Sequence, residues 1–260
     1  MPTPPLVLIT GASSGIGQAL ALRYHQAGFA LALSARRTAA LQDWAKGLGL
    51  GPDRCGIYGA DVADADSIVA AGQACLAQQG VPDVVIANAG ISIGVDTAIR
   101  SDLDAMRQTF ATNNLGMAAT FHPFIDPMVR RGAGRLVGIA SVAGIRGLPG
   151  HGAYCASKAA VISYCESLRG ELRPTGVKVT TISPGYIDTP LTRQNRYAMP
   201  FLMAPDKFAA QAFASIEAGA TYRVIPWQMA VVAKLLRVLP DALLDRALAG
   251  RPRKHRAPPA

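Results

Sequence analysis

The chain has 260 residues, half of them hydrophobic, and a formal charge of +9, which suits one α/β domain with a large core. The charge does not indicate a nucleic-acid-binding surface, because the residues from Ala220 onward, with eight basic and two acidic side chains, carry +6 of it and no motif with interleaved aromatics accompanies them. The four cysteines form no close Cys or Cys/His cluster, so we expect reduced, buried thiols and no metal site.

The first predicted element is a buried strand followed by a glycine-rich turn. The apolar run from Leu6 is too short for a signal peptide or a membrane span, and we expect a cytoplasmic protein. The turn has the spacing Gly-x-x-x-Gly-x-Gly and leads into a helical pattern from Gln18 to Gln26. Glycines let the backbone approach a pyrophosphate, and N–H groups at a helix start favour an anion. A dinucleotide site is therefore predicted at Gly11, Ser13, Ser14, Gly15, Ile16 and Gly17.

The second predicted strand, Phe29 to Ala35, ends in two arginines and no acid. An acidic residue at this point would bind the ribose 2′-hydroxyl of NAD, whereas arginine accommodates the 2′-phosphate of NADP. Arg36 and Arg37 therefore favour NADP(H) over NAD(H) by charge pairing. Simple solvation of two surface arginines is the alternative.

Two further strands end in short motifs. One strand covers residues 54–60 and the other 83–87, with a helix over 64–79 between them. Asp61-Val62 follows the first of these strands, and Asn88-Ala89-Gly90 follows the second. Beyond them, Ser101 is expected to cap a long helix over residues 102–130, bent near Pro123 and Pro127.

The fifth predicted strand, residues 134–140, delivers a serine into a glycine-rich loop that opens a helix running to about residue 172. Tyr154 and Lys158 lie four residues apart on that helix, so their side chains share one face. A nearby ammonium lowers the pKa of a phenol, and the hydroxyl of Ser141 can hydrogen-bond a substrate oxygen beside the tyrosine. Such a site protonates a carbonyl oxygen or deprotonates an alcohol.

The remaining strands complete a single sheet. A sixth strand covers residues 177–183 and a seventh begins at Tyr222. Because strands alternate with helices and the motifs lie at the carboxyl ends of strands, we predict an α/β fold with a doubly wound, mostly parallel, seven-stranded sheet of Rossmann type. Its expected order is 3-2-1-4-5-6-7, in one domain over residues 1–225.

Residues 226–250 are expected to form an amphipathic helical extension, and residues 251–260 a basic, disordered tail. The helix after Trp227 is too short to span a bilayer. Its apolar residues could dock on an anionic surface at the inner face of the membrane or close over a greasy substrate; core packing or a subunit contact fits the composition equally well. The residues in question are Trp227, Met229, Val232, Leu236 and Leu239.

With the glycine turn and a serine thirteen residues before the tyrosine, the Tyr-x-x-x-Lys pair resembles the short-chain dehydrogenase/reductase family. The similarity extends from about Leu6 to Ile225. It implies hydride transfer with a nicotinamide cofactor, a small carbonyl or alcohol substrate, and a homodimer or homotetramer formed through two long helices.

The resemblance also implies individual roles. Asn113 would hold a water near Lys158 in a proton relay, and Lys158 would hold the nicotinamide ribose. Arg36 would occupy the 2′-phosphate position. Further cofactor contacts implied in this way are Asp61 and Val62 at the adenine, Asn88, Ala89 and Gly90 in the cleft, Pro184, Gly185, Ile187 and Thr189 at the nicotinamide, and Tyr154.

Family members cover their substrates with the region that corresponds to residues 191–205. Four apolar residues here either face an apolar substrate or are ordinary packing, and short apolar runs do not separate the two. They are Met199, Phe201, Leu202 and Met203.

We therefore predict an oxidoreductase that transfers a hydride between NADP(H) and a carbonyl or secondary alcohol of an apolar, lipid-, steroid- or aromatic-ketone-like substrate. The alternative is a catalytically silent NADP(H)-binding sensor that kept the fold and lost the chemistry. The presence of Asn113, Ser141, Tyr154 and Lys158 argues against it. A methyltransferase would not account for the spacing of the last three.

Overall fold

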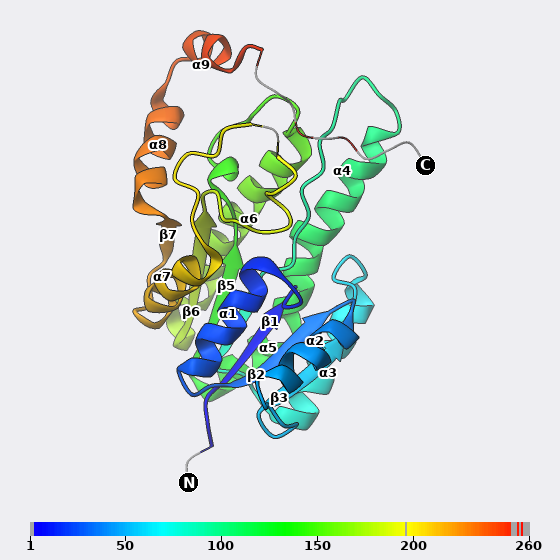
Figure 1. The fold of residues 1–260 in the computed structure, drawn as a ribbon. Helices are drawn as coiled ribbons and strands as arrows, with labels where there is room; N and C mark the ends of the chain where they lie inside the picture. The colour runs from blue at the N-terminus through cyan, green and yellow to red at the C-terminus, as the bar shows by residue number, and fades with distance from the viewer. Residues whose placement is uncertain (1–2, 196, 251–253, 255, 257–260) are drawn as a thin grey trace.

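The computed structural model describes residues 3–195, 197–250, 254 and 256. Seven parallel strands form one sheet in the order β3-β2-β1-β4-β5-β6-β7, which confirms the predicted topology (Figure 1). The winding direction reverses between β1 and β4, where doubly wound sheets bind ligands at the carboxyl ends of their strands. The strands are β1 (Leu6–Thr10), β2 (Ala30–Ala35), β3 (Cys55–Gly59), β4 (Val84–Ala87), β5 (Gly134–Ile139), β6 (Val177–Pro184) and β7 (Tyr222–Ile225).

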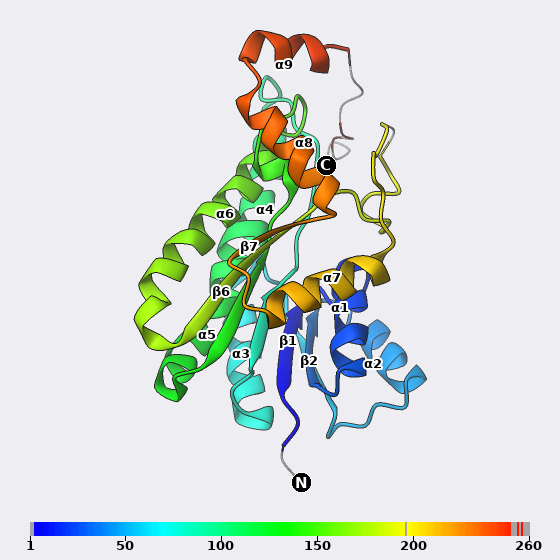
Figure 2. The same cartoon turned by 90° about the vertical axis from the view of Figure 1, so that its left-hand side faces the viewer.

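Helices cover both faces of the sheet (Figure 2). One face carries α1 (Gly15–Gln26), α2 (Thr38–Gly47) and α7 (Pro205–Glu217). The other carries α3 (Ala65–Gln79), α4 (Asp102–Phe110), α5 (Gly116–Arg131) and α6 (Gly152–Leu172).

The apolar strands belong to two core clusters, one on each side of the sheet. In β1, Leu6 and Leu8 join the cluster that packs against α3, α5 and α6, whereas Val7 and Ile9 join the cluster under α1 and α7. Successive side chains point to opposite faces of a strand, so a strand buried on both faces has to be apolar throughout. The sheet is therefore a packed platform that holds its carboxyl-end loops in place.

The long helix predicted over residues 102–130 is interrupted. It comprises α4, a π-helical turn at Ala111–Leu115 and then α5, which continues through Pro123 and Pro127. The predicted cap is wrong: the Ser101 side chain makes no capping hydrogen bond, because its backbone already has helical angles (φ −64°).

Beyond β7, the chain forms α8 (Trp227–Val238) and α9 (Asp241–Leu248), which lie past the carboxyl end of the sheet (Figures 1 and 2). Among the described residues, no helix combines the length and apolar character needed to cross a membrane.

The turn between α8 and α9 is held by Arg146. Its guanidinium donates to the carbonyl oxygens of Arg237 (3.4 Å) and Leu239 (3.3 Å) and pairs with the Asp241 carboxylate. Arg237 in turn donates to the carbonyl of Ile145 at 3.1 Å. These contacts connect the C-terminal helices to the loop that follows β5.

The prediction of a disordered tail falls mainly on residues 251–253, 255 and 257–260, which lie outside the described residues. Two side chains of the tail have defined contacts. Arg256 forms a bidentate pair with Asp102, with Nε–Oδ2 at 2.6 Å and Nη2–Oδ1 at 2.9 Å. Lys254 Nζ donates to Asn195 Oδ1 at 2.7 Å.

Candidate active site

The glycine turn between β1 and α1 is built for close backbone approach. Gly11 has φ +66°, and a Cβ there would lie 2.9 Å from the Cα of Ala89. A Cβ on Gly17 would lie 2.3 Å from the carbonyl oxygen of Gly11, so only glycine lets α1 start this close to β1. Ser14 is the N-cap residue of α1 without a side-chain capping bond, and the first turn holds no acid. The N-terminal N–H groups of α1 are thus suited to bind an anion.

Arg36 and Arg37 follow β2 and are exposed at the neighbouring carboxyl end. The Arg36 guanidinium lies 4.0 Å from the Asp61 carboxylate after β3, and both side chains are well exposed. An exposed pair at this distance contributes little stability, so Arg36 remains available to a ligand.

The motif after β4 joins the central strands. The backbone N–H of Asn88 donates to Thr10 Oγ1 at 3.1 Å, and Asn88 Nδ2 donates to the Thr10 carbonyl at 2.9 Å. These bonds fix the ends of β1 and β4 side by side, directly under the glycine turn.

Ser141 follows β5 and is buried beside the start of α6. Its Oγ accepts from the N–H of Ala143 at 3.1 Å. The loop then touches α6: a Cβ on Gly144 would lie 2.6 Å from the carbonyl carbon of Lys158. The glycine therefore allows the loop and the helix to pack closely enough to bring their side chains to one site.

Tyr154 and Lys158 lie on the same face of α6, as their spacing predicts. Lys158 Nζ is 5.8 Å from the centre of the Tyr154 ring and donates to the carbonyl oxygen of Ile139 at 2.8 Å. Burial lowers the pKa of Lys158 to about 8.

The pKa of Tyr154 corrects a prediction. Burial raises the pKa of the Tyr154 phenol, while its hydrogen bond with Ser141 acts in the opposite direction. The sequence predicted a lowered pKa from the nearby ammonium. The cost of burying the phenolate is larger than the stabilisation from its neighbours, so the phenol stays protonated at neutral pH.

Asn113 lies in the π-helical turn rather than in a regular helix. Its Oδ1 accepts from the N–H of Ile91 at 2.8 Å, and its Nδ2 donates to the Ile91 carbonyl at 3.0 Å and to Ser157 Oγ at 2.9 Å. A Cβ on Gly90 would lie 3.2 Å from Asn113 Oδ1 and 3.4 Å from Lys158 Nζ, so Gly90 separates these two polar groups. Such π-turns often occur at functional sites.

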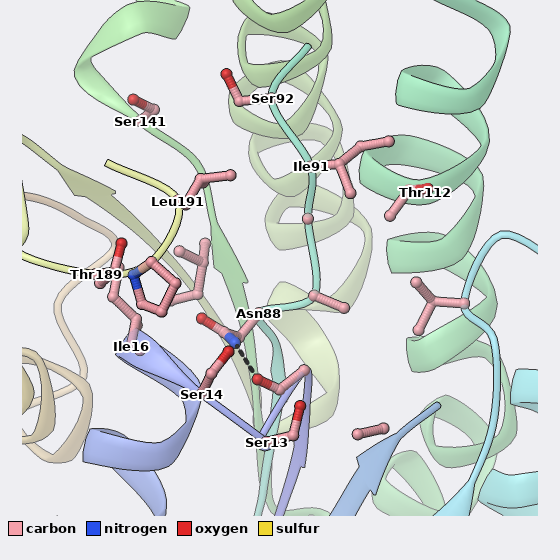
Figure 3. A pocket seen from close by; sticks show the side chains of 18 of the residues that line it. Ser13, Ser14, Ile16, Asn88, Ile91, Ser92, Thr112, Ser141, Thr189 and Leu191 are labelled. Atoms are coloured by element: carbon pink, nitrogen blue, oxygen red, sulfur yellow. Dashed lines mark hydrogen bonds between the residues drawn. The ribbon is translucent and has the colours of Figure 1, made fainter. Parts of the chain in front are cut away.

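A cleft of about 520 Å³ brings most of the predicted site residues together at the carboxyl edge of the sheet. In the close view of Figure 3, Ser13, Ser14 and Ile16 of the glycine turn lie at the opposite end from Ser141. Gly17 and Asn113 do not line the cleft and lie behind its wall. The predicted residues that do line it are Gly11, Ser13, Ser14, Gly15, Ile16, Arg36, Arg37, Asp61, Val62, Asn88, Ala89, Gly90, Ser141, Tyr154, Lys158, Pro184, Gly185, Ile187 and Thr189.

A second cavity, of about 940 Å³, adjoins the cleft and is mostly apolar. Its roof comes from Met229, Val232 and Leu236 of α8 and from Leu244 and Leu248 of α9. Six residues line both spaces: Ser92, Ser141, Tyr154, Gly185, Leu191 and Thr192.

The structure separates the alternatives for the region over residues 191–205. Met199 lines the second cavity. Phe201 and Leu202 are about half exposed and outside it, and Met203 packs on the core under α7. One of the four residues therefore faces the cavity, and the other three do not.

Sequence reasoning missed several residues that line the second cavity. His151, Tyr197 and Lys254 are among them. No motif identifies them, because His151 and Tyr197 come from two different loops and Lys254 from the C-terminal tail. Only the folded chain brings them together. The apolar pattern of the C-terminal helices was the one available signal.

The cleft fits a nicotinamide dinucleotide by the chemistry of its donors. The glycine turn leaves no Cβ between the backbone and a pyrophosphate, the N-terminal N–H groups of α1 face the cleft, and two arginines lie at its β2 end. Among the described residues, no group of three or more His, Cys, Asp or Glu side chains could hold a metal ion.

Comparisons with known proteins agree with this geometry. The sequence model of the family described as short chain dehydrogenase matches residues 5–199. An uncharacterized oxidoreductase of Myxococcus xanthus is 40% identical over 243 residues, covering 92% of this chain and 94% of that protein. The dehydrogenase/reductase SDR family member 7B of Bos taurus is 34% identical over 271 residues, covering 96% and 82%.

Two solved structures are similar over nearly the whole chain. A short-chain dehydrogenase from Streptomyces avermitilis superposes with a TM-score of 0.80 at 28% identity, covering 95% of this chain and 94% of that one. A short-chain dehydrogenase from Sphingobium yanoikuyae in complex with NADPH superposes with a TM-score of 0.78 at 25% identity, covering 97% and 98%.

Proposed function

The chain belongs to the short-chain dehydrogenase/reductase family as an NAD(P)-dependent oxidoreductase, and we propose that it transfers a hydride between NADP(H) and a carbonyl or secondary alcohol of an apolar substrate. One observation carries the proposal. Ser141 and Tyr154 lie in the wall that a nucleotide-type cleft shares with a large apolar cavity. A substrate in the cavity therefore meets a cofactor in the cleft at these two hydroxyls.

Each side chain has a step in carbonyl reduction. When bound in the cleft, NADPH would supply the hydride for the new C–H bond at the carbonyl carbon. Tyr154 donates its phenolic proton to the carbonyl oxygen, a step that its raised pKa suits because the phenol is protonated at neutral pH. The Ser141 hydroxyl orients the same oxygen and stabilises its developing charge. In alcohol oxidation the proton moves in the opposite direction.

Lys158 and Asn113 support the proton donor. The Lys158 ammonium, held by the Ile139 carbonyl, stabilises the phenolate formed after proton transfer and binds the nicotinamide ribose. Asn113 lies across Gly90 from the Lys158 amine, which supports its role in a water-mediated relay that returns a proton to Tyr154.

The cofactor side of the proposal rests on charge. In this proposal the glycine turn and the N-terminus of α1 would hold the pyrophosphate, Asp61 and Val62 the adenine, and Pro184, Gly185, Ile187 and Thr189 the nicotinamide. All these residues except Gly17 of the turn line the cleft. Arg36 and Arg37 bind the 2′-phosphate, which favours NADP(H) over NAD(H). Similar structures hold NADPH in one case and NADH in another, so the comparisons support a nicotinamide cofactor, and the two arginines carry the preference for NADP(H).

Tyr154→Phe is the test of the proposed chemistry. We expect kcat/KM for NADPH-dependent reduction of apolar ketones to fall by about a hundredfold or more, because the proton donor is lost. NADPH binding, measured by fluorescence titration, should change little. Tyr222→Phe, at an exposed tyrosine of β7 that lines neither the cleft nor the second cavity, is the matched control. Turnover in Tyr154→Phe equal to that of the wild type would refute the assignment.

Two further properties belong to the proposal. The outer surface of α8 docks on an anionic membrane surface, and the protein assembles as a homodimer or homotetramer through α4, α5 and α6. Exposed apolar residues on α8 support the first contact, and those on α4, the π-helical turn and α6 support the second.

A further inference from the structure

The second cavity holds an unusual basic group. Lys254 lines this otherwise mostly apolar space, and its side chain is partly buried. Its Nζ donates to the side-chain Oδ1 of Asn195 at 2.7 Å and to the carbonyl oxygen of Leu191 at 3.5 Å. Both acceptors are neutral, and an ammonium has three N–H donors. Among the described residues no third acceptor contacts this ammonium, which leaves one donor for a ligand.

The charges around the cavity do not neutralise this ammonium. No acidic residue is among the described residues that line it. The other fully charged group in the wall is Arg146, whose guanidinium is already paired with Asp241. A cationic group partly removed from water, without a carboxylate among its contacts, gains from an anionic ligand.

Lys254 is held on the cavity rather than left free at the chain end. Two residues further on, Arg256 makes its bidentate pair with Asp102, and its backbone bridges to Gly94. Asp102 is itself buried and also accepts from the N–H of Asp96 at 2.7 Å. The tail is thus anchored two residues beyond the position from which Lys254 reaches the cavity.

The charge of Lys254 reaches the catalytic end of the cavity. Burial lowers the pKa of His151, and the positive charge of Lys254 lowers it further. His151 precedes Tyr154 by one helical turn, and its Nε2 lies 3.4 Å from the hydroxyl of Tyr197. Lys254 and His151 therefore influence each other in the cavity wall, whereas the residues of α8 and α9 that line the cavity are apolar.

From this arrangement we propose that the substrate carries a carboxylate on a hydrocarbon body, and that Lys254 binds the carboxylate while α8 and α9 cover the hydrocarbon. This inference rests on the proposed function and narrows it to keto or hydroxy acids. The cavity, of about 940 Å³, is large enough for a small carboxylic acid with a hydrocarbon chain.

Binding of simple carboxylates tests the proposal without turnover. The dissociation constants of the straight-chain acids from hexanoate to tetradecanoate, and of the matching primary amides, are measured by calorimetry on the NADP-loaded full chain. We expect at least one acid to bind about ten- to a hundredfold more tightly than its amide, as for a charge-assisted hydrogen bond. Lys254→Met should remove this difference.

Two further variants test whether the tighter binding of acids depends on Lys254 and on its anchor. Lys234→Met removes an exposed ammonium from α8 that does not line the cavity, and should leave the acid-to-amide ratio unchanged. Arg256→Gln weakens the anchor at Asp102 and should reduce the ratio without changing amide binding. Circular dichroism confirms that each variant is folded.

The pH dependence provides a second readout. Burial lowers the pKa of Lys254 below its ordinary value, so carboxylate binding should weaken as pH rises through that pKa. In Lys254→Met, binding should not change over the same range.

Equal affinities of the wild type for acids and amides, or an unchanged ratio in Lys254→Met, would overturn the carboxylate proposal. These results are distinguishable from failure of the proposed function. If ketones are reduced with NADPH but acids and amides bind with equal affinity, only the carboxylate proposal is wrong. If acids bind more tightly than amides but no keto acid is turned over, only the proposed hydride-transfer reaction is wrong.

Discussion

Arg36 and Arg37 are the residues on which cofactor choice depends. Both are exposed at the cleft, and the nearest described carboxylate, that of Asp61, is 4.0 Å from Arg36. We predict that replacing both arginines by alanine raises KM for NADPH by about ten- to a hundredfold, because charge-assisted bonds to the 2′-phosphate are lost. KM for NADH should stay the same.

Steady-state kinetics with both cofactors measure this change. Arg169→Ala, which removes an exposed arginine from α6, is the control. If NADPH and NADH are affected equally in the double variant, the arginines do not read the 2′-phosphate.

The residues that line the cleft were largely predictable from the sequence, but the directions of their pKa shifts were not. Glycine spacing and the Tyr154–Lys158 interval are local patterns, and the residues they name, except Gly17, line one cleft. The raised pKa of Tyr154 depends on burial by distant segments, which no spacing encodes. Lys254 escaped prediction for the same reason, since its neighbours in space are far away in sequence.

Helix α8 has apolar side chains on two sides. Of the five residues predicted to cover either a membrane or a substrate, Met229, Val232 and Leu236 line the second cavity, and Trp227 and Leu239 do not. The outer stripe is a different set, spaced by three or four residues and largely exposed: Trp227, Val231, Leu235 and Val238.

The outer stripe supports contact with an anionic membrane. Trp227 is 69% exposed and Leu235 62%, and the basic Lys234 adjoins the stripe on the helix surface. We predict that the protein pellets with vesicles containing phosphatidylglycerol, and that Trp227→Ser with Leu235→Ser abolishes pelleting. Leu48→Ser, at an exposed leucine beyond α2, should not change it. Equal pelleting of the double variant would exclude this surface.

Strands and helices were predictable where a local sequence pattern marks their ends. Strand boundaries differ from the predicted ones by about one residue, because apolar runs and turn residues delimit them. The π-helical turn at Ala111–Leu115 was not foreseen, since its sequence reads as ordinary helix. The cap at Ser101 failed because the chain is already helical there.

At the scale of the molecule, exposed apolar residues on α4, the π-helical turn and α6 support assembly through these helices. They are Leu103, Met106, Leu115 and Tyr164. We predict that Leu115→Asp, at a residue 55% exposed, converts the oligomer to monomers, because a charge would be buried at the contact. Light scattering after size exclusion measures the mass. Leu48→Asp is the control; an unchanged mass in Leu115→Asp would exclude this contact.

The topology of the whole sheet was predictable because alternating strands and helices with right-handed crossovers permit few arrangements. The position of Arg256 was not predictable, because no local sequence pattern specifies Asp102 as its partner.

The Arg146 bonds to the turn between α8 and α9 tie the roof of the cavity to the loop after β5. The family match stops at residue 199, and both roof helices come after it. The proposed catalytic and cofactor-binding residues all come before that point, whereas most of the cavity roof comes after it. Substitutions in α8 and α9 can therefore reshape the substrate cavity without replacing any residue proposed to take part in the reaction.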